Sequence, residues 1–367
     1  MKYQLYSDKW ISDKPIVLYD IGSRESISIL DKIVANGHKV IAVVNAASLK
    51  MSEIIQEKYW NYTIWNGEEL IANQDNINVV VGSYENNKIK QACEILAEIG
   101  EFSVCGMRSL ACFDWFFDSN KVFDESKIQY VYDHLEDEQS KATLLGIKNF
   151  KLTKKAKFLE EIECKEECYF ISHPMFKLHD REVFIDGGTF IGDTILRFIE
   201  VSNGKYDYIY GFEPNEISYA TAEALIKLQG NSNIEISQSG LYNRSTELIF
   251  MDMSNNHEGG RIYDDEKLSD KACAVKVPVV SLDDYLAKSE HKVTYLKLDV
   301  EGSEEAALDG AKKIITCDHP RLAVCSYHKM CDFYEIPYKI MMEYPEYHVA
   351  LRHHSSNTVD TICYAWI

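Results

Sequence analysis

The chain has 367 residues, of which 46% are hydrophobic and 26% are charged, and its net charge is −19. These values are typical of a folded soluble protein, and the length indicates two domains. The negative charge argues against nucleic acid or an anionic membrane as a partner, because both repel an acidic surface. Ten cysteines lie mostly within apolar segments, and no apolar run approaches the ~20 residues that span a bilayer. Since the start also lacks the features of a signal peptide, the sequence favours the reducing cytoplasm.

Residues 1–109 predict a small α/β domain. Apolar runs at 15–19, 40–44 and 79–81 indicate strands that alternate with helices, which is typical of a parallel sheet. The region resembles the Rossmann-like N-terminal domain of some sugar-modifying enzymes, whose first turn begins with glycine. Here Asp20 takes that place and would repel an anionic nucleotide. A structural role or homo-oligomerisation is therefore favoured, and the alternative is a site for part of a sugar nucleotide near Gly22, Ser23 and Arg24.

Residues 110–167 have a helical pattern without a glycine- or proline-rich run, which predicts a helical connector. Tyr169 and Phe170 follow it, close enough to a second domain to cover a ligand there, although core packing is the favoured interpretation. Cys164 and Cys168 have no matching second pair of cysteines, so a metal site at this pair is not favoured.

The most informative stretch is 183–194, which reads VFIDGGTFIGDT. It predicts a strand, a glycine-rich turn and a helix, an arrangement that holds nucleotide-like ligands. A dinucleotide fingerprint is not met, because Thr189 takes the place of its second glycine. An acid at the strand end, Asp186, would repel a pyrophosphate but suits the cationic amino-acid end of S-adenosylmethionine (SAM). An ordinary glycine-rich turn is the alternative.

Two further strands are predicted after this turn. The strand at 206–212 ends at Glu213, whose carboxylate can accept hydrogen bonds from both hydroxyls of a ribose. The strand at 234–236 leads into a loop at 238–242 that would lie near an adenine. Apolar runs at 248–251 and 275–279 then predict an added hairpin, and the polar loop between them, 254–260, is typical of an acceptor site.

The last strands carry the remaining functional groups. The strand at 293–298 ends in Asp299-Val300-Glu301-Gly302, and the strand at 321–326 ends in Tyr327-His328-Lys329. Functional groups gather at the carboxyl ends of parallel strands. The tail predicts an antiparallel hairpin of 347–352 with 361–366 at the sheet edge, with His353 and His354 in its loop.

Together these motifs resemble those of the FkbM family of SAM-dependent methyltransferases. The sequences DGGTFIGDT, FEPN, LDDYL, KLDVEGSE and DGAKK occur in that order from residue 186 to residue 313, and the resemblance extends from about Tyr169 to the C-terminus. It implies a domain at 168–367 with the class I methyltransferase fold, a Rossmann-like doubly wound sheet, which methylates hydroxyl groups, commonly on sugars or natural products. It also implies SAM as cofactor, bound by Asp186, Gly187, Gly188, Thr189, Gly192, Asp193, Thr194, Glu213, Pro214, Gly240, Leu241 and Asp299.

Methyl transfer requires an aligned acceptor oxygen and a group that takes its proton. The candidates are His328, His257, Asp299 and Glu301, of which His328 is favoured because it follows a strand end and titrates near neutrality. A structural, hydrogen-bonded histidine is the alternative. The catalytic set is thus His328, Asp299 and Glu301. A divalent metal on Asp299, His328 and Asp332, with Glu301 as an alternative ligand, is not required by the spacing and is not favoured.

The leading hypothesis is a cytoplasmic SAM-dependent O-methyltransferase that acts on a sugar, a sugar nucleotide or a glycan precursor. One alternative is an NAD(P)-dependent oxidoreductase of sugar nucleotides, which predicts a second fingerprint glycine that neither turn has. Another is a non-catalytic nucleotide-binding scaffold, against which the three carboxylates at strand ends argue.

Overall fold

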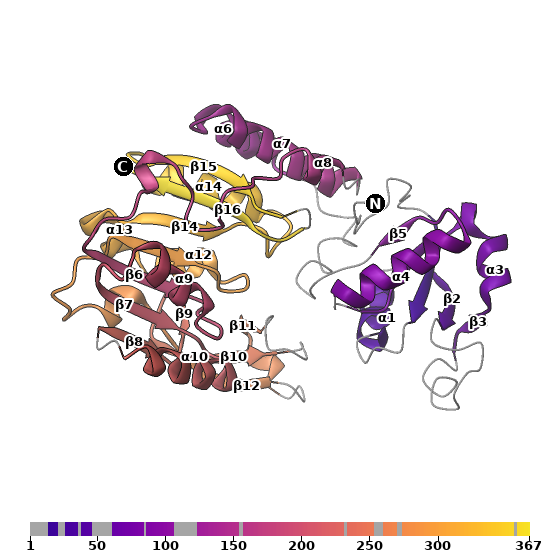
Figure 1. The fold of residues 1–367 in the computed structure, drawn as a ribbon, viewed down its shortest axis with the longest axis horizontal. Helices are drawn as coiled ribbons and strands as arrows, with labels where there is room; N and C mark the ends of the chain where they lie inside the picture. The colour runs from indigo at the N-terminus through magenta and orange to yellow at the C-terminus, as the bar shows by residue number, and fades with distance from the viewer. Residues whose placement is uncertain are drawn as a thin grey trace. The chain divides into compact units, whose positions relative to one another are not determined.

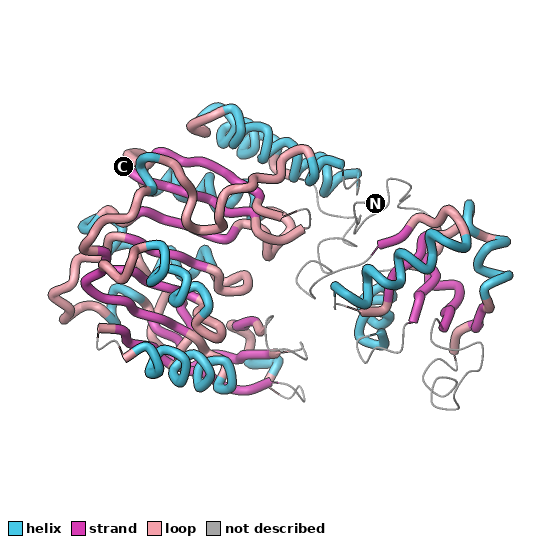
Figure 2. Tube along the Cα trace, in the orientation of Figure 1, coloured by secondary structure: helices cyan, strands magenta, loops and turns pink. Residues whose placement is uncertain are grey.

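The computed structural model describes residues 14–20, 26–35, 38–45, 61–83, 86–105, 123–153, 157–230, 233–252, 260–269, 274–355 and 358–367. The chain divides into two compact units, one made of Met1–Val122 with Leu145–Glu161 and the other of Phe123–Leu144 with Ile162–Ile367. Figures 1 and 2 show the helices and strands of each unit.

The smaller unit contains a five-stranded parallel sheet in the order β3-β2-β1-β4-β5. Its strands are β1 (Ile16–Asp20), β2 (Val40–Asn45), β3 (Thr63–Trp65), β4 (Asn78–Val81) and β5 (Val104–Cys105). Its helices include α1 (Ser26–Ala35), α3 (Gly67–Ala72), the short η1 (Gln74–Asn76) and α4 (Asn86–Ile99). The predicted parallel α/β arrangement is therefore present. Strand β3 has only three residues, too few for a visible hydrophobic period.

Asp20 ends β1 as a fully buried side chain, and the Ser26 hydroxyl donates a hydrogen bond to its Oδ1 at 3.0 Å. It thereby ties the strand to the start of α1. The turn that contains Gly22, Ser23 and Arg24 lies outside the described residues, so the alternative of a sugar-nucleotide site there stays a prediction.

The larger unit is built on a seven-stranded sheet in the order β15-β16-β14-β13-β6-β7-β8. The strands are β6 (Glu182–Gly187), β7 (Tyr206–Phe212), β8 (Ile234–Ser237), β13 (Tyr295–Leu298), β14 (Arg321–Cys325), β15 (His348–His353) and β16 (Thr361–Trp366). Strands β8, β7, β6, β13 and β14 are parallel, whereas β16 runs antiparallel to both β14 and β15. The chain leaves β6 first towards β7 and β8, and later returns to its other side with β13 and β14. The carboxyl ends of β6 and β13 therefore form the switch point at which doubly wound sheets bind ligands.

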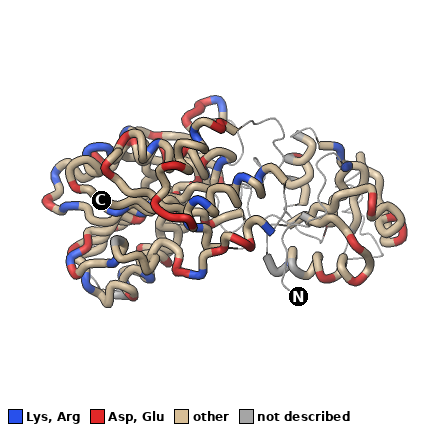
Figure 3. Tube along the Cα trace, turned by 90° about the horizontal axis from the view of Figure 1, so that it is seen from above, with Lys and Arg blue, Asp and Glu red and all other residues tan. Residues whose placement is uncertain are grey.

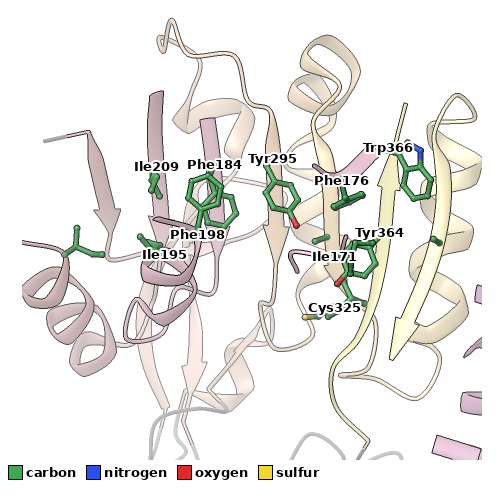
Figure 4. Packing of buried hydrophobic residues seen from close by; sticks show 14 residues of the cluster. Ile171, Phe176, Phe184, Ile195, Phe198, Ile209, Tyr295, Cys325, Tyr364 and Trp366 are labelled. Carbon is green, nitrogen blue, oxygen red and sulfur yellow. The ribbon is translucent and has the colours of Figure 1, made fainter. Parts of the chain in front are cut away.

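Aromatic packing holds the helices against this sheet. Phe184 of β6 stacks on Phe198 of α9 (Asp193–Val201), with ring centroids 4.4 Å apart. Tyr295 of β13 and Phe176 of η2 (Pro174–Phe176) continue the same fully buried cluster (Figure 4). Burying aromatic side chains contributes strongly to folding. This cluster lies on β6 and β13, so it fixes the two strands whose ends carry the candidate site.

A second, four-stranded sheet in the order β11-β10-β12-β9 is inserted between β8 and β13. Its strands are β9 (Gly240–Leu241), β10 (Thr246–Met251), β11 (Arg261–Tyr263) and β12 (Ala274–Val280). Strands β10 and β12 pair antiparallel, as the sequence predicts, and β11 extends the pair beyond a simple hairpin.

The remaining helices are α6 (Glu125–His134), α7 (Glu138–Thr153), α8 (Lys157–Glu160), α10 (Glu216–Gln229), η3 (Glu266–Leu268), α11 (Leu282–Tyr285), α12 (Glu304–Asp309), α13 (Lys312–Asp318) and α14 (Asp332–Glu343). Among the described residues, no helix combines the length and the apolar character needed to cross a membrane. Acidic and basic residues are interspersed along both units (Figure 3).

One prediction for the tail is wrong. His353 does not lie in the hairpin loop but ends β15, fully buried, with its Nδ1 2.8 Å from the hydroxyl of Thr361. The strand extends one residue further than its apolar pattern suggests, because this hydrogen bond to β16 satisfies the buried imidazole nitrogen.

Candidate active site

The glycine-rich turn after β6 is held by hydrogen bonds to the neighbouring strand β7. The backbone N–H groups of Gly188 and Thr189 both donate to the carbonyl of Phe212, each at 3.0 Å. The Thr189 hydroxyl donates to the carbonyl of Asp186 at 2.9 Å and accepts from the N–H of Phe212 at 3.0 Å. Thr189 is fully buried, so it shapes the turn. Gly192 follows as the N-cap of α9 with φ +89°, a conformation that glycine adopts without strain.

Asp186 and Lys297 form a buried ion pair beneath this turn. The Lys297 Nζ lies 2.8 Å from Asp186 Oδ1, and neither side chain is more than 1% exposed. The same ammonium donates to the carbonyls of Gly187 at 3.2 Å and Gly188 at 2.8 Å. Burial raises the pKa of Asp186 to about 6, which leaves its carboxylate ionised at neutral pH beside the ammonium. The cation that meets Asp186 is thus supplied by the chain itself, and Oδ2 has no hydrogen-bond partner among the described residues.

Glu213 follows the end of β7 and faces the same turn. Its Oε2 accepts a hydrogen bond from the N–H of Phe190 at 2.9 Å, and its Oε1 accepts one from the N–H of Asn215 at 2.8 Å. Burial outweighs these two donors and raises the pKa of Glu213 to about 7. A carboxylate oxygen has more than one lone pair, so both oxygens can still accept hydrogen bonds from a ligand.

Asp299 follows the end of β13 and receives two phenol donors. The Tyr169 hydroxyl donates to Oδ2 at 2.8 Å and the Tyr327 hydroxyl donates to Oδ1 at 3.2 Å. Burial disfavours its charged form, but Lys297 and His328 outweigh burial and lower the pKa of Asp299. Tyr169 adopts φ +66°, a strained conformation that for a non-glycine residue often marks a functional position. Tyr169 therefore contacts a site residue as well as packing beside the core, and Tyr327 joins it.

His328 lies among carboxylates on both sides of its ring. Its Nδ1 is 2.8 Å from Glu304 Oε1, and its Nε2 is 3.4 Å from Asp299 Oδ1 and 3.6 Å from Glu301 Oε2. Burial opposes its protonation, but Glu304 and Glu301 outweigh burial and raise the pKa of His328 well above its usual value. The prediction that His328 titrates near neutrality is therefore wrong, because the surrounding carboxylates stabilise its protonated form.

The other predicted ligand residues lie on α9, after β7 and on β9 of the smaller sheet. Asp193 is exposed at the start of α9, Thr194 and Pro214 are half-buried, and Gly240 and Leu241 form the buried strand β9. The Leu241 side chain packs on Gly187, where a Cβ would lie 2.8 Å from Leu241 Cδ1. His257 lies outside the described residues.

Asp332, which the sequence offers as a metal ligand, is buried and turns its Oδ2 to the N–H of Lys329 at 2.7 Å. Glu304 instead joins Asp299 and His328 in a group of ligand atoms within 4.8 Å of one another. Sequence reasoning missed Glu304 and Lys297. A lysine inside a buried strand was the available signal for Lys297, whereas Glu304 resembles an ordinary acid in the first turn of a helix.

Comparison with known proteins gives one family match. Residues 186–354 match the family described as the methyltransferase FkbM domain. No curated protein sequence matches the chain.

The solved structures that resemble this chain include one that shares its fold. The crystal structure of Methyltransferase FkbM from Methylobacillus flagellatus KT aligns with a TM-score of 0.66 and 20% identity, over 95% of this chain and 90% of that chain. An rRNA methylase from Streptococcus thermophilus aligns with a TM-score of 0.34 and 14% identity, over 52% of this chain and 88% of that chain. Fibrillarin from Aeropyrum pernix, solved with natively bound S-adenosyl-L-methionine, aligns with a TM-score of 0.33 and 13% identity, over 52% of this chain and 69% of that chain.

Proposed function

Because residues 186–354 form an FkbM methyltransferase domain, we propose that this chain transfers a methyl group from SAM to a hydroxyl group of a sugar, a sugar nucleotide or a glycan precursor. The observation that supports SAM is the pair of carboxylates, Glu213 and Asp299, that follow the ends of β7 and β13 on either side of β6, whose own Asp186 is already paired with Lys297. Such a carboxylate-rich edge suits a cationic sulfonium donor and disfavours a pyrophosphate. The sugar class of the acceptor rests on the family resemblance.

Residues of the turn after β6 and of the neighbouring strand ends could hold SAM. Glu213 would hold the ribose hydroxyls with the lone pairs that its two backbone donors leave free. Gly188 lets the turn approach the end of β13 closely, because an added Cβ at φ +78° would lie 1.8 Å from the carbonyl oxygen of Asp299. The Asp186–Lys297 pair would support the turn from below.

SAM supplies an electrophilic methyl group, which the acceptor oxygen takes in an in-line displacement that releases S-adenosylhomocysteine. The chain must align the acceptor hydroxyl and receive its proton. Both nitrogens of His328 face carboxylates, so the geometry favours Asp299 or Glu301 as the group that contacts the hydroxyl. Each of these two side chains is about a quarter exposed and can meet an acceptor. His328 would keep the two carboxylates in place. The cytoplasmic location and self-association through the N-terminal domain remain predictions.

Calorimetric titration of the full chain with SAM, and separately with NADH, tests the proposal. We expect one SAM to bind per chain and NADH not to bind. Binding of NADH in place of SAM would support the oxidoreductase alternative, and binding of neither would contradict the proposal. Methyl release from labelled SAM in the presence of candidate sugars would then test the acceptor class.

Glu213 predicts the pH dependence of SAM binding. Burial raises the pKa of Glu213 to about 7 in the ligand-free protein. Ribose hydroxyls form stronger hydrogen bonds with the ionised carboxylate than with the protonated carboxyl group. Lowering the pH protonates Glu213 and competes with SAM, so affinity should fall by about tenfold between pH 8 and pH 6. The variant Glu213→Gln should bind SAM about 30-fold more weakly at pH 8 and lose most of this pH dependence.

The control for this measurement is Glu216→Gln, which changes an exposed acid in the first turn of α10. It should keep both the affinity and the pH dependence of the unmodified chain. An unchanged pH profile in Glu213→Gln would show that Glu213 does not contact the ligand.

A further inference from the structure

The position in front of His328 Nε2 has the properties of a cation site. We infer that Asp299, Glu301 and His328 bind a divalent cation, and that Glu304 orients the imidazole for this purpose. The inference deepens the proposed function, on which its catalytic meaning rests.

Two carboxylate oxygens lie close to His328 Nε2. His328 Nε2 lies 3.4 Å from Asp299 Oδ1 and 3.6 Å from Glu301 Oε2. An octahedral cation with bonds of about 2.1 Å holds adjacent ligand atoms about 3 Å apart, so both carboxylates, and the side chain of Glu301 most of all, would move inwards to complete the coordination. His328 is only 2% exposed, and its Nε2 has no hydrogen-bond partner within the described part of the chain. A buried polar atom without a hydrogen bond calls for an explanation, and a bound cation provides one.

Glu304 explains the orientation of the ring. Its Oε1 is 2.8 Å from His328 Nδ1 and is itself held by the N–H groups of Val300 at 3.0 Å and Gly302 at 3.3 Å. Metal-binding histidines commonly direct their other ring nitrogen to a carboxylate, which fixes the tautomer. A cation that replaces the Nε2 proton would leave the remaining ring proton on Nδ1, towards Glu304, and would bind the Nε2 lone pair between the carboxylates of Asp299 and Glu301.

Charge supports the same conclusion. Three carboxylates surround a single imidazole, and the nearby ammonium of Lys297 is already bound to Asp186 and to the carbonyls of the turn. Buried charges are normally paired or bound to metal ions. Glu301 holds φ +53°, and the strained backbone places its carboxylate beside Nε2.

The mixed donor set indicates the kind of cation. Carboxylate oxygens with one imidazole suit Mn²⁺ better than Mg²⁺, which prefers oxygen ligands and retains its waters. At this position the cation would lie beside the acceptor hydroxyl and lower its pKa, so that the oxygen loses its proton more readily before it attacks the methyl group.

Electron paramagnetic resonance of Mn²⁺ added to the EDTA-treated full chain, without SAM, measures this site directly. We expect one Mn²⁺ per chain, with affinity at least about tenfold weaker in both Glu301→Gln and Glu304→Gln. Glu301 is partly exposed, so its substitution should leave the fold intact. The matched control is Glu305→Gln, which neutralises the acid next to Glu304 outside the cluster and should bind Mn²⁺ normally.

The outcomes separate this inference from the proposed function. If SAM binds in calorimetry but no stoichiometric Mn²⁺ signal appears, the cation site is wrong and the methyltransferase proposal stands. If Mn²⁺ binds equally to the unmodified chain, Glu301→Gln and Glu305→Gln, the cation lies elsewhere and the inference fails. If Mn²⁺ binds as expected but SAM does not, the proposed function fails instead.

Discussion

Replacing Gly188 with alanine should destabilise the larger unit by about 3–5 kcal/mol and abolish SAM binding. An added Cβ would lie 1.8 Å from the carbonyl oxygen of Asp299 and 2.8 Å from its carbonyl carbon. Both atoms belong to the backbone, which cannot rotate away as a side chain would. Asp299 is also tied to β6 by its N–H, which donates to the carbonyl of Gly187 at 2.9 Å. Relief of the clash would therefore pull apart the ends of β6 and β13.

Gly230→Ala is the matched control for this substitution. Gly230 has nearly the same backbone angle, φ +71° against +78°, but an added Cβ there meets no atom within 4 Å. Gly230→Ala should lower the free energy of unfolding by only about 1 kcal/mol, the cost of placing an alanine at positive φ, and should keep SAM binding. Denaturant unfolding and calorimetry measure the two effects. Equal losses in both variants would show that the close approach of Gly188 to Asp299 has no energetic consequence.

The sequence predicts the strands of the larger sheet well, because each is a short apolar run that ends at an acid or a polar turn. Strand β7 has its predicted bounds, and β6, β13 and β14 differ by a few residues at their ends. Glycines in the turn and acids at strand ends also predict which edge of the sheet carries the site. These features are local, so one sequence is sufficient to find them.

Contacts between distant segments could not be predicted in the same way. The alternation of residues places Lys297 and Asp299 on one side of β13, but it does not show that Lys297 pairs with Asp186 on the next strand. The approach of Glu304 to His328 likewise depends on how the turn after β13 meets the turn after β14. The sequence offers Asp332, and not Glu304, as a possible ligand beside His328. Packing decides otherwise.

Lys297→Met should destabilise the larger unit by about 3–5 kcal/mol, because it leaves the carboxylate of Asp186 buried without its counter-ion. Methionine matches the length of the lysine stem, so the lost charge and its hydrogen bonds to two turn carbonyls account for the effect. The deficit should grow as the pH rises. Without Lys297, the pKa of Asp186 in the folded state lies even further above its pKa in the unfolded state. Above the unfolded-state pKa the unfolded chain releases this proton more readily than the folded chain does, so rising pH favours unfolding.

The double variant Lys297→Met with Asp186→Asn separates charge from shape. Removing both charges should recover much of the lost stability and remove the added pH dependence, since no isolated buried carboxylate remains. SAM binding should stay impaired, because the carbonyls of Gly187 and Gly188 still lack the donor that positions the turn. Lys227→Met is the control, as it breaks an exposed pair with Glu223 and should change stability by less than about 0.5 kcal/mol. Unfolding measured at pH 5 and pH 8 tests these expectations. A double variant no more stable than Lys297→Met would show that the lysine acts through packing rather than through its charge.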